Sequence, residues 1–439
     1  MNSPKWPKAQ ILYVSLAVAT AVALAILLTA QIVGTSNSGT AAHIESPRSA
    51  TTILVPPKMP AVNSWILSTE PGLSNNTGSD NLMGVSCASA SFCVAAGYVL
   101  KSINTDYLLI WNGTKWILDT SSSLDAVGSR SNYLAAISCP TTIFCAATGG
   151  FNYGISTGQN AVLIWNGRVW TDDTSPALSS ARSQNNFSSG ISCISSSFCM
   201  LSGGYTDSAG AVQDLFAKWD GTKWTTFDSP SLSTAPDQYN DLISVSCAAA
   251  NFCVAIGTYY DGSTRNSGSH PLLLTWNGVD WTRGQLVGAG QGSGLNWVSC
   301  TSTSFCIIAG GFFNGSGGQS AVWTWNGTSW KVDADPASML TQSNGFNSVS
   351  CISPLYCVAI GNYRAGGQIG QNYLTTWDGS MWSLSDNSAL STSQTQYNLF
   401  NSVSCVRSPI PSGFCVAVGN YYTSDTPSGS ARDLVVTGP

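Results

Sequence analysis

The chain has 439 residues, a formal net charge of −5 at pH 7, and only 9% charged residues. Its lysines and arginines form no cluster, which argues against a nucleic-acid partner. Apolar residues make up 43% of the sequence, too large a share for an intrinsically disordered chain.

The N-terminal part contains an apolar segment long enough to cross a membrane. Residues 11–33 carry no charge, and a membrane-spanning helix needs about 20 apolar residues. Lys5 and Lys8 precede this segment, so the positive-inside rule places residues 1–10 in the cytoplasm. We predict a transmembrane signal-anchor helix over residues 11–33, which makes the protein a single-pass protein of the cell membrane with the rest outside. The alternative is a cleaved signal peptide and a secreted protein.

The segment that follows has the composition of a linker. Residues 34–61 are rich in Ser, Thr and Gly, and Pro56, Pro57 and Pro60 stand near their end. Gly- and Ser-rich chains are flexible, whereas prolines stiffen a linker. We therefore predict a flexible tether over residues 34–61, which holds a folded domain of residues 62–439 away from the membrane.

The 14 cysteines fall into seven close pairs at regular intervals. Zinc sites usually have tighter spacing and bring two pairs together, often with histidine. The two histidines, His43 and His270, do not lie beside a pair. We therefore predict no metal site and seven disulfides, which form in an oxidising compartment. The predicted disulfides are Cys87–Cys93, Cys139–Cys145, Cys193–Cys199, Cys247–Cys253, Cys300–Cys306, Cys351–Cys357 and Cys405–Cys415.

Each cysteine pair belongs to a repeat, because successive first cysteines are 51 to 54 residues apart. A first strand carries Val-Ser-Cys or Ile-Ser-Cys, and a second carries Phe-Cys-Val-Ala. A third ends in Trp-Asn-Gly or Trp-Asp-Gly, and a fourth begins at a Trp three residues after that Gly. Asn-Gly and Asp-Gly suit a two-residue type I′ turn, which predicts a tight hairpin between the third and fourth strands. The serine before each first cysteine is interpreted as a small residue required on a crowded inner strand.

Four strands in about 40–50 residues are typical of a propeller blade. The last copy shows only three strands and stops near residue 438, whereas residues 63–68 match a fourth strand around Trp65. An N-terminal strand that completes the last blade closes a propeller and protects its edges. We therefore predict an all-β fold, a seven-bladed β-propeller of four-stranded blades with one intra-blade disulfide each.

The repeat also resembles known families. The Trp-Asn/Asp-Gly-x-x-Trp hairpin is similar to the blade turns of Kelch-type and Asp-box propellers. The Ser-Cys-x5-Cys-x-Ala-x-Gly unit resembles disulfide-stapled repeat proteins secreted by bacteria, none of which is a characterised match. The resemblance covers residues 63–439. The chain departs from the Ser/Thr-x-Asp-x-Gly spacing of the Asp box and from the paired glycines of Kelch repeats. The resemblance therefore implies a fold and no active-site residues.

Candidate ligand-binding residues recur where the second strand ends and just before the first strand. Aromatic rings pack on the apolar faces of sugars, and amides bond hydroxyl groups, so this pattern suits a glycan. The alternative is structural, with the rings wedged between blades and the amides capping turns. The candidates are Tyr98, Tyr153, Tyr205, Tyr259, Tyr260, Phe312, Phe313, Tyr363, Tyr421, Tyr422, Asn132, Asn186, Asn240, Asn344 and Asn398.

The sequence contains no Gly-x-Ser-x-Gly elbow, no His-Glu-x-x-His and no phosphate loop, so we predict no catalytic residues, no cofactor and no enzyme. His270 lies near Asp261 and Arg265, but a lone histidine is a weak candidate for a general base. The main hypothesis is an extracellular, membrane-anchored binding module whose loops contact a glycan or a cell-surface protein. Two alternatives stay open: an extracellular polysaccharide hydrolase or lyase, and a structural component of the cell envelope.

Overall fold

The computed structural model describes most of residues 58–439, which form one compact unit. The described ranges are residues 65–68, 79–100, 104–121, 131–152, 158–173, 185–208, 210–227, 229–230, 239–260, 270–290, 292–313, 318–333, 343–365, 369–385, 396–408, 413–422 and 430–438. The predicted cytoplasmic segment, membrane helix and tether lie outside these ranges. Within them, no helix has the length and apolar character needed to cross a membrane.

The described chain is all β, and its strands form seven antiparallel units of four strands each. Sheet 1 contains β2 (Ser79–Ser89), β3 (Phe92–Leu100), β4 (Thr105–Trp111) and β5 (Trp116–Asp119). Sheet 2 contains β6 (Ser131–Thr141), β7 (Phe144–Asn152), β8 (Gly158–Trp165) and β9 (Trp170–Asp172). Sheet 3 contains β10 (Asn186–Ser195), β11 (Phe198–Thr206), β12 (Val212–Trp219) and β13 (Trp224–Phe227).

The remaining sheets repeat this order along the chain. Sheet 4 contains β14 (Tyr239–Ala249), β15 (Phe252–Tyr260), β16 (His270–Trp276) and β17 (Trp281–Arg283). Sheet 5 contains β18 (Ser293–Ser302), β19 (Phe305–Phe313), β20 (Gly318–Trp325) and β21 (Trp330–Val332). Sheet 6 contains β22 (Asn344–Ser353), β23 (Tyr356–Ala365), β24 (Ile369–Trp377) and β25 (Trp382–Leu384). Sheet 7 contains β26 (Asn398–Val406), β27 (Phe414–Tyr422), β28 (Ala431–Gly438) and β1 (Ile66–Leu67).

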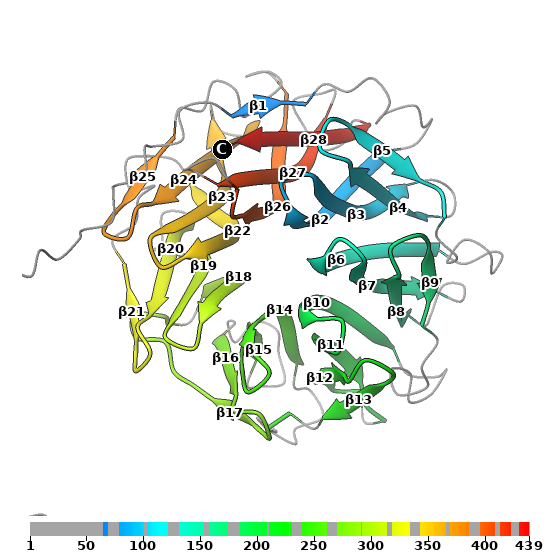
Figure 1. The fold of residues 1–439 in the computed structure, drawn as a ribbon. Coiled ribbons are helices and arrows are strands. Elements are labelled where there is room, and N and C mark those ends of the chain that lie inside the picture. Colours follow the sequence, from blue (N-terminus) through cyan, green and yellow to red (C-terminus); the bar gives the residue numbers. More distant parts are fainter. Residues whose placement is uncertain are drawn as a thin grey trace, which may run out of the picture. The chain divides into compact units, whose positions relative to one another are not determined.

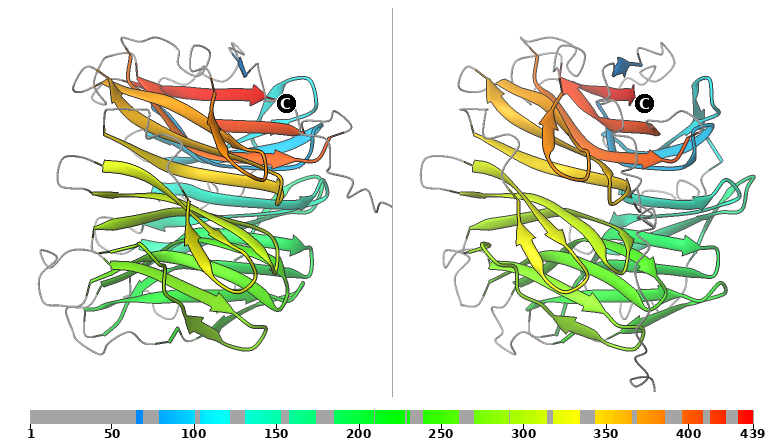
Figure 2. Two further views of the ribbon diagram at one scale, coloured as in Figure 1. Left: turned by 90° about the vertical axis from the view of Figure 1, so that its left-hand side faces the viewer. Right: turned by 60° about the vertical axis from the view of Figure 1, so that its left-hand side comes forward.

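The sheets are arranged like the blades of a propeller. Figure 1 shows them around a common centre, with the first strand of each sheet innermost, and Figure 2 shows the same arrangement from the side. A parallel bridge from Val212 to Tyr239 links sheets 3 and 4. Each first strand begins, and each second strand ends, at one edge of the ring, which we call the loop face. The disulfide-bonded turns and the third-to-fourth-strand turns lie at the opposite edge, the turn face.

The predicted exchange of strands between the two ends of the chain is found. β1 pairs antiparallel with β28, with Ile66 opposite Thr437. Trp65 is only 6% exposed and packs in the hydrophobic cluster of sheets 6 and 7. The amide of Asn401 in sheet 7 donates to the carbonyl of Leu82 in sheet 1 over 2.7 Å. The last sheet is therefore completed by the N-terminal strand and bonded directly to the first.

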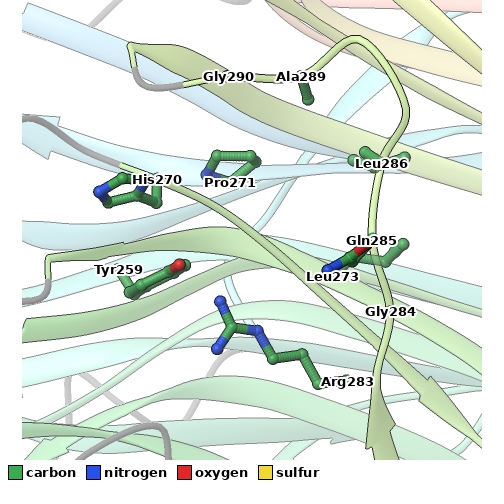
Figure 3. A pocket seen from close by; sticks show the side chains of 10 residues that line it. All are labelled: Tyr259, His270, Pro271, Leu273, Arg283, Gly284, Gln285, Leu286, Ala289 and Gly290. Atoms are coloured by element: carbon green, nitrogen blue, oxygen red, sulfur yellow. The ribbon is translucent and has the colours of Figure 1, made fainter.

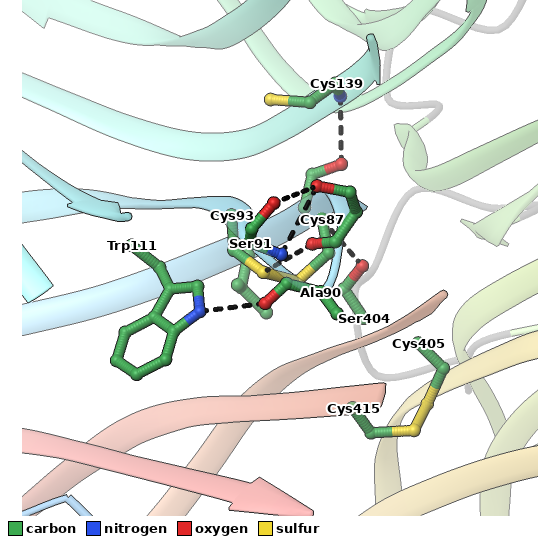
Figure 4. Close-up of a disulfide and its surroundings, with 12 residues drawn as sticks. Cys87, Ala90, Ser91, Cys93, Trp111, Cys139, Ser404, Cys405 and Cys415 are labelled. Carbon is green, nitrogen blue, oxygen red and sulfur yellow. Dashed lines mark hydrogen bonds between the residues drawn. A yellow bond between two sulfur atoms is a disulfide. The ribbon is translucent and has the colours of Figure 1, made fainter. Parts of the chain in front are cut away.

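All seven predicted disulfides are present, each joining the first and second strands of one sheet. A loop this short stabilises the fold by about 2 kcal/mol per disulfide through loop-closure entropy. The Trp at the end of the third strand supports the same turn: Nε1 of Trp111 donates to the carbonyl of Ala90 over 3.0 Å (Figure 4). Five other sheets repeat this bond, from Trp165, Trp219, Trp276, Trp325 and Trp377.

The predicted hairpin between the third and fourth strands is present, but its turn differs from the predicted one. Four residues, 112–115, connect Trp111 to its partner Trp116, instead of the two of a type I′ turn. The side-chain oxygen of Asn112 accepts hydrogen bonds from the backbone N–H groups of Thr114 and Lys115, both at 3.0 Å. Gly113 in this Asx turn has a positive φ of 94°. The geometry of this turn therefore depends on the Asn side chain as well as on the Gly.

The serines before the first cysteines are more than small residues. Each hydroxyl accepts a hydrogen bond from the backbone N–H of the first cysteine in the next sheet, at 2.9–3.0 Å. The seven bonds run in order around the ring, from Cys139 to Ser86, Cys193 to Ser138, Cys247 to Ser192, Cys300 to Ser246, Cys351 to Ser299, Cys405 to Ser350 and Cys87 to Ser404. The innermost strands of neighbouring sheets are thus joined by such a hydrogen bond at every junction, including the junction between the last and first sheets.

Replacing one of these serines should weaken the ring. In Ser138→Ala, the N–H of Cys193 loses its partner between two sheets, which costs about 1–3 kcal/mol of unfolding free energy. Equilibrium denaturation of the variant measures this loss. The control is Ser304→Ala in an exposed turn, which should change stability by less than about 0.5 kcal/mol. Equal stability of the two variants would show that the hydrogen bonds of these serine hydroxyls do not stabilise the junctions between sheets.

Candidate functional site

The strand register places the predicted aromatic residues on two different faces of their sheets. Five stand opposite the repeated Asn position: Tyr205 opposite Asn186, Tyr259 opposite Asn240, Phe312 opposite Ser293, Tyr363 opposite Asn344 and Tyr421 opposite Asn398. Tyr98 stands one residue earlier in its strand, opposite Asn81, so its side chain points to the other face. Tyr260, Phe313 and Tyr422 stand one residue later. Tyr153 lies outside the described residues.

The predicted amides are buried between the sheets. The exposed fractions of Asn132, Asn186, Asn240, Asn344 and Asn398 are all between 0% and 6%. Oδ1 of Asn344 accepts hydrogen bonds from the backbone N–H and the hydroxyl of Ser320 in the neighbouring sheet. These positions favour a structural role for the amides between adjacent sheets. Their direct contact with a ligand stays a prediction.

The predicted aromatic residues are mostly half-buried, and several pack on other rings. Tyr260 packs edge-on against Tyr239, with ring centroids 5.8 Å apart, and Tyr422 packs in the same way against Tyr397 at 5.7 Å. Phe312 is the most open of the group, with 40% of its surface exposed. The contact of these aromatic residues with a glycan therefore stays a prediction for each residue.

A cavity of about 530 Å³ opens where β16 begins and β17 ends, at the loop face of sheet 4. It lies between the start of β16 and the segment 284–290 that leaves β17, as Figure 3 shows. A cavity of this size is within the range of pockets that hold small ligands, about 300–1,000 Å³. Its polar side chains come from Tyr259, His270, Arg283 and Gln285.

Three of these side chains stack on one another. The rings of Tyr259 and His270 are nearly parallel, at 24°, with centroids 5.1 Å apart. Cζ of Arg283 lies 4.5 Å from the centroid of the Tyr259 ring, a cation–π contact. Figure 3 shows Tyr259 between the other two. A guanidinium cation, an imidazole and a phenol thus lie together in one cavity at the loop face of sheet 4.

The sheet register produces this meeting. Tyr259 and His270 are paired neighbours on β15 and β16, so their side chains share one face. Arg283 is paired with Leu274 on β17, and the same face carries it toward Tyr259. The sequence analysis singled out Tyr259 and His270 separately and missed Arg283. The available signal was its position, because Arg283 is the one arginine within the fourth strand of any sheet. Asp261 and Arg265 lie outside the described residues.

A second group of ionisable side chains is buried at the junction of sheets 7 and 1. Asp433 accepts a 2.8 Å hydrogen bond from the hydroxyl of Tyr107, and Asp80 is fully buried nearby. Burial raises the pKa of Asp433 to about 8, the Asp80 carboxylate adds to this rise, and Tyr107 and Arg432 oppose it. Burial closes this group to a substrate, so we interpret it as structural.

Asp433 should make stability depend on pH. Its folded-state pKa lies above the unfolded value of about 3.9, so the folded chain holds a proton that the unfolded chain has lost between these values. The contribution of Asp433 to the free energy of unfolding should therefore fall by up to about 1.4 kcal/mol per pH unit from pH 4 to pH 8. Asp433→Asn should flatten this fall and be more stable than the parent at pH 8. Parallel denaturation profiles for both proteins from pH 4 to pH 8 would refute the assignment.

No family model matches the chain, and no curated protein matches it either. Among solved structures, an ulvan lyase of polysaccharide lyase family PL25, bound to -[GlcA(1-4)Rha3S]-, is similar with a TM-score of 0.51 at 10% identity, over 81% of this chain and 94% of that one. The GH74 xyloglucanase from Xanthomonas campestris has a TM-score of 0.47 at 14% identity, over 84% of this chain and 55% of that one. The fucose-specific lectin from Aleuria aurantia has a TM-score of 0.37 at 14% identity, over 67% of this chain and 92% of that one.

The likeness to the ulvan lyase concerns the fold, and it corrects the expectation that the chain is not an enzyme. A similar fold is found in a polysaccharide lyase. The lack of a familiar catalytic motif therefore does not exclude catalysis. The alternative of a polysaccharide hydrolase or lyase therefore stays open beside the main hypothesis of a binding module.

Proposed function

We propose that the chain is a seven-bladed β-propeller that cleaves an acidic polysaccharide outside the cell, at the cavity of sheet 4. The observation that carries this proposal is the meeting of Arg283, His270 and Tyr259 in that cavity. The likeness of the fold to that of an ulvan lyase agrees with it.

The charge of the cavity indicates the class of sugar. Of the residues that line it, Arg283 carries a permanent positive charge, and none is Asp or Glu. Guanidinium groups bind carboxylates through two parallel hydrogen bonds, so Arg283 suits the carboxylate of a uronic acid. Hydrolysis by paired carboxylates requires two acidic side chains at the bond that breaks. The lining of this cavity does not supply them, which favours elimination.

Elimination requires a base, an acid and a neutralised carboxylate. Arg283 pairs with the uronate carboxylate and so favours loss of the neighbouring C5 proton. His270 accepts that proton, the role histidine most often has in catalysis. The electron pair left at C5 forms a double bond to C4, and the C4–O bond to the adjoining sugar breaks. Tyr259 donates its hydroxyl proton to the departing oxygen, and the products are a sugar hydroxyl and an unsaturated uronate.

The carboxylate of the substrate provides the test. The full chain should cleave a polysaccharide that contains glucuronic acid and release unsaturated uronate, measured by its ultraviolet absorbance. The matched control substrate is the same polymer after its carboxyl groups have been reduced to alcohols, which should not be cleaved. Equal cleavage of both polymers, or cleavage of neither across a panel of uronate polysaccharides, would contradict the proposal.

We also propose that residues 11–33 anchor the protein in the cell membrane, with the tether of residues 34–61 presenting the ring outside. The uncharged segment after Lys5 and Lys8 supports this topology, and the seven disulfides support an oxidising compartment. Protease treatment of intact cells should remove the ring while residues 1–10 stay protected. A protein released into the medium without these residues would indicate signal cleavage instead.

A further inference from the structure

A second, smaller cavity of about 230 Å³ lies at the loop face of sheets 5 and 6. It forms where one cross-strand pair lacks side chains. In the other sheets, the pair one residue inward from the repeated Asn position includes at least one larger residue. The seven pairs are Asn81–Tyr98, Tyr133–Gly150, Phe187–Gly204, Asp241–Thr258, Gly294–Gly311, Gly345–Asn362 and Leu399–Asn420. Sheet 5 alone has glycine on both strands.

Sheets 2 and 3 show what fills this place elsewhere. The side chains of Tyr133 and Phe187 lie directly over the glycines opposite them: a Cβ on Gly150 would meet the Tyr133 hydroxyl at 2.8 Å, and a Cβ on Gly204 would meet the Phe187 ring at 2.5 Å. In sheet 5, a Cβ on Gly294 would meet no atom within 4 Å. Protein interiors are normally close-packed. The opening in sheet 5 therefore reflects the absence of one aromatic side chain at a position where related sheets carry it.

The side chains around this opening are those of a site for a neutral sugar. Phe312 contributes the exposed aromatic surface, 40% of which is open to solvent. Asn296 and Gln319 contribute amides, and Nδ2 of Asn296 is held by a 2.6 Å bond to the carbonyl of Phe346. Of the residues that line the cavity, none is charged. Its volume is below that of most ligand pockets, about 300–1,000 Å³, which suits a single ring.

The two cavities lie on either side of one turn. Gly290 lines the cavity of sheet 4, and Gly292 lines the cavity of sheet 5. The backbone N–H of Ser293 donates to the carbonyl of Gly290 over 3.0 Å, and the hydroxyl of Ser293 accepts from the N–H of Gly290 over 3.1 Å. These two hydrogen bonds tie Ser293, beside the smaller cavity, to Gly290 in the lining of the larger one.

We propose that the cavity of sheets 5 and 6 is a second carbohydrate subsite, which packs one neutral sugar ring on Phe312. Resting on the proposed function, we infer that this ring belongs to the same polysaccharide whose uronate occupies the cavity of sheet 4. The substrate is then a chain in which neutral sugars accompany uronic acids, and it crosses the turn of residues 290–293.

The test fills the cavity with the side chain that a related sheet already carries. Gly294 has open space for a Cβ and no positive φ, so Gly294→Phe should fold with an unchanged melting temperature. Binding of rhamnose, xylose, glucose and galactose to the full chain is measured by saturation-transfer NMR. At least one sugar should bind the parent, and Gly294→Phe and Phe312→Ala should each weaken that binding at least tenfold. Leu399→Phe, at the same position in sheet 7, is the matched control and should bind as the parent does.

Two results overturn the subsite: no sugar binds the parent, or Gly294→Phe binds as tightly as the parent. The link between the cavities is tested by cleavage. Gly294→Phe should raise the KM for the uronate polysaccharide at least fivefold without lowering kcat, and an unchanged KM would refute a shared chain. If a sugar binds at Phe312 while no uronate polysaccharide is cleaved, the proposed function fails and the subsite stands.

Discussion

Trp65→Ala is expected to destabilise the ring by about 3–5 kcal/mol, the usual cost of removing a large buried aromatic side chain. Trp65 is 6% exposed and packs in a cluster with Phe400, Leu434 and Val436. Its ring lies over Gly438 so closely that a Cβ there would meet it at 2.6 Å. The variant should also detach β1 and leave β28 as an open sheet edge, which promotes association between chains. Denaturation curves measure the loss, and light scattering measures the association.

The control separates ring closure from local packing. Trp116 is the equivalent residue of sheet 1, with 5% exposure, but its strand is held in the chain by the hairpin to β4. Trp116→Ala should lose similar stability without exposing an edge. Hydrogen exchange in β28 should therefore rise in Trp65→Ala and stay low in Trp116→Ala. Equal exchange in the two variants would show that β1 does not close the ring.

His270→Ala should lower kcat on a uronate polysaccharide by about 100-fold to 10,000-fold, the usual contribution of a general base or acid. Arg283→Ala should lower kcat/KM by about 100-fold or more, because the carboxylate then loses its positive partner. Arg283→Lys keeps the charge but loses the planar pair of hydrogen bonds, so it should recover only part of the activity. Steady-state kinetics on the purified full chain measure all three.

The matched control for these variants is Arg168→Ala. Arg168 is an exposed arginine in the turn between β8 and β9, on the face opposite the cavity. The Arg168→Ala variant should cleave the polysaccharide at the same rate as the parent protein. Full activity of His270→Ala and Arg283→Ala would place the chemistry elsewhere in the molecule.

The repeat made the fold predictable from the sequence. Cysteine pairs at 51–54-residue intervals define one hairpin seven times, and a Trp after each Asn-Gly or Asp-Gly defines a second hairpin six times, so an error in one copy is corrected by the others. The out-of-phase strand around Trp65 was predictable for the same reason, because six other copies show what a fourth strand looks like. The turn at Asn112 was not, since it depends on a side-chain hydrogen bond that the Asn-Gly pair shares with shorter turns.

The candidate site was only partly predictable, because it breaks the repeat. Tyr259 and His270 were visible in the sequence, but their stacking depends on the register between β15 and β16. Arg283 joins them from a different hairpin, and an isolated arginine has no pattern to reveal it. The amides at Asn132 and equivalent positions do follow the repeat, and the structure buries them between sheets. In this molecule, repetition indicates scaffold, and the departures from it at sheets 4 and 5 indicate the site.

The fate of the substrate oxygen tests the central claim most directly. Digestion of the uronate polysaccharide in heavy-oxygen water, followed by mass spectrometry, distinguishes elimination from hydrolysis. We predict an unsaturated uronate at one new end and no heavy oxygen in either product, with the product absent for Arg283→Ala. Products that carry heavy oxygen and no unsaturation would contradict the account, since they require an attacking water and a catalytic group that the cavity of Tyr259, His270 and Arg283 does not supply.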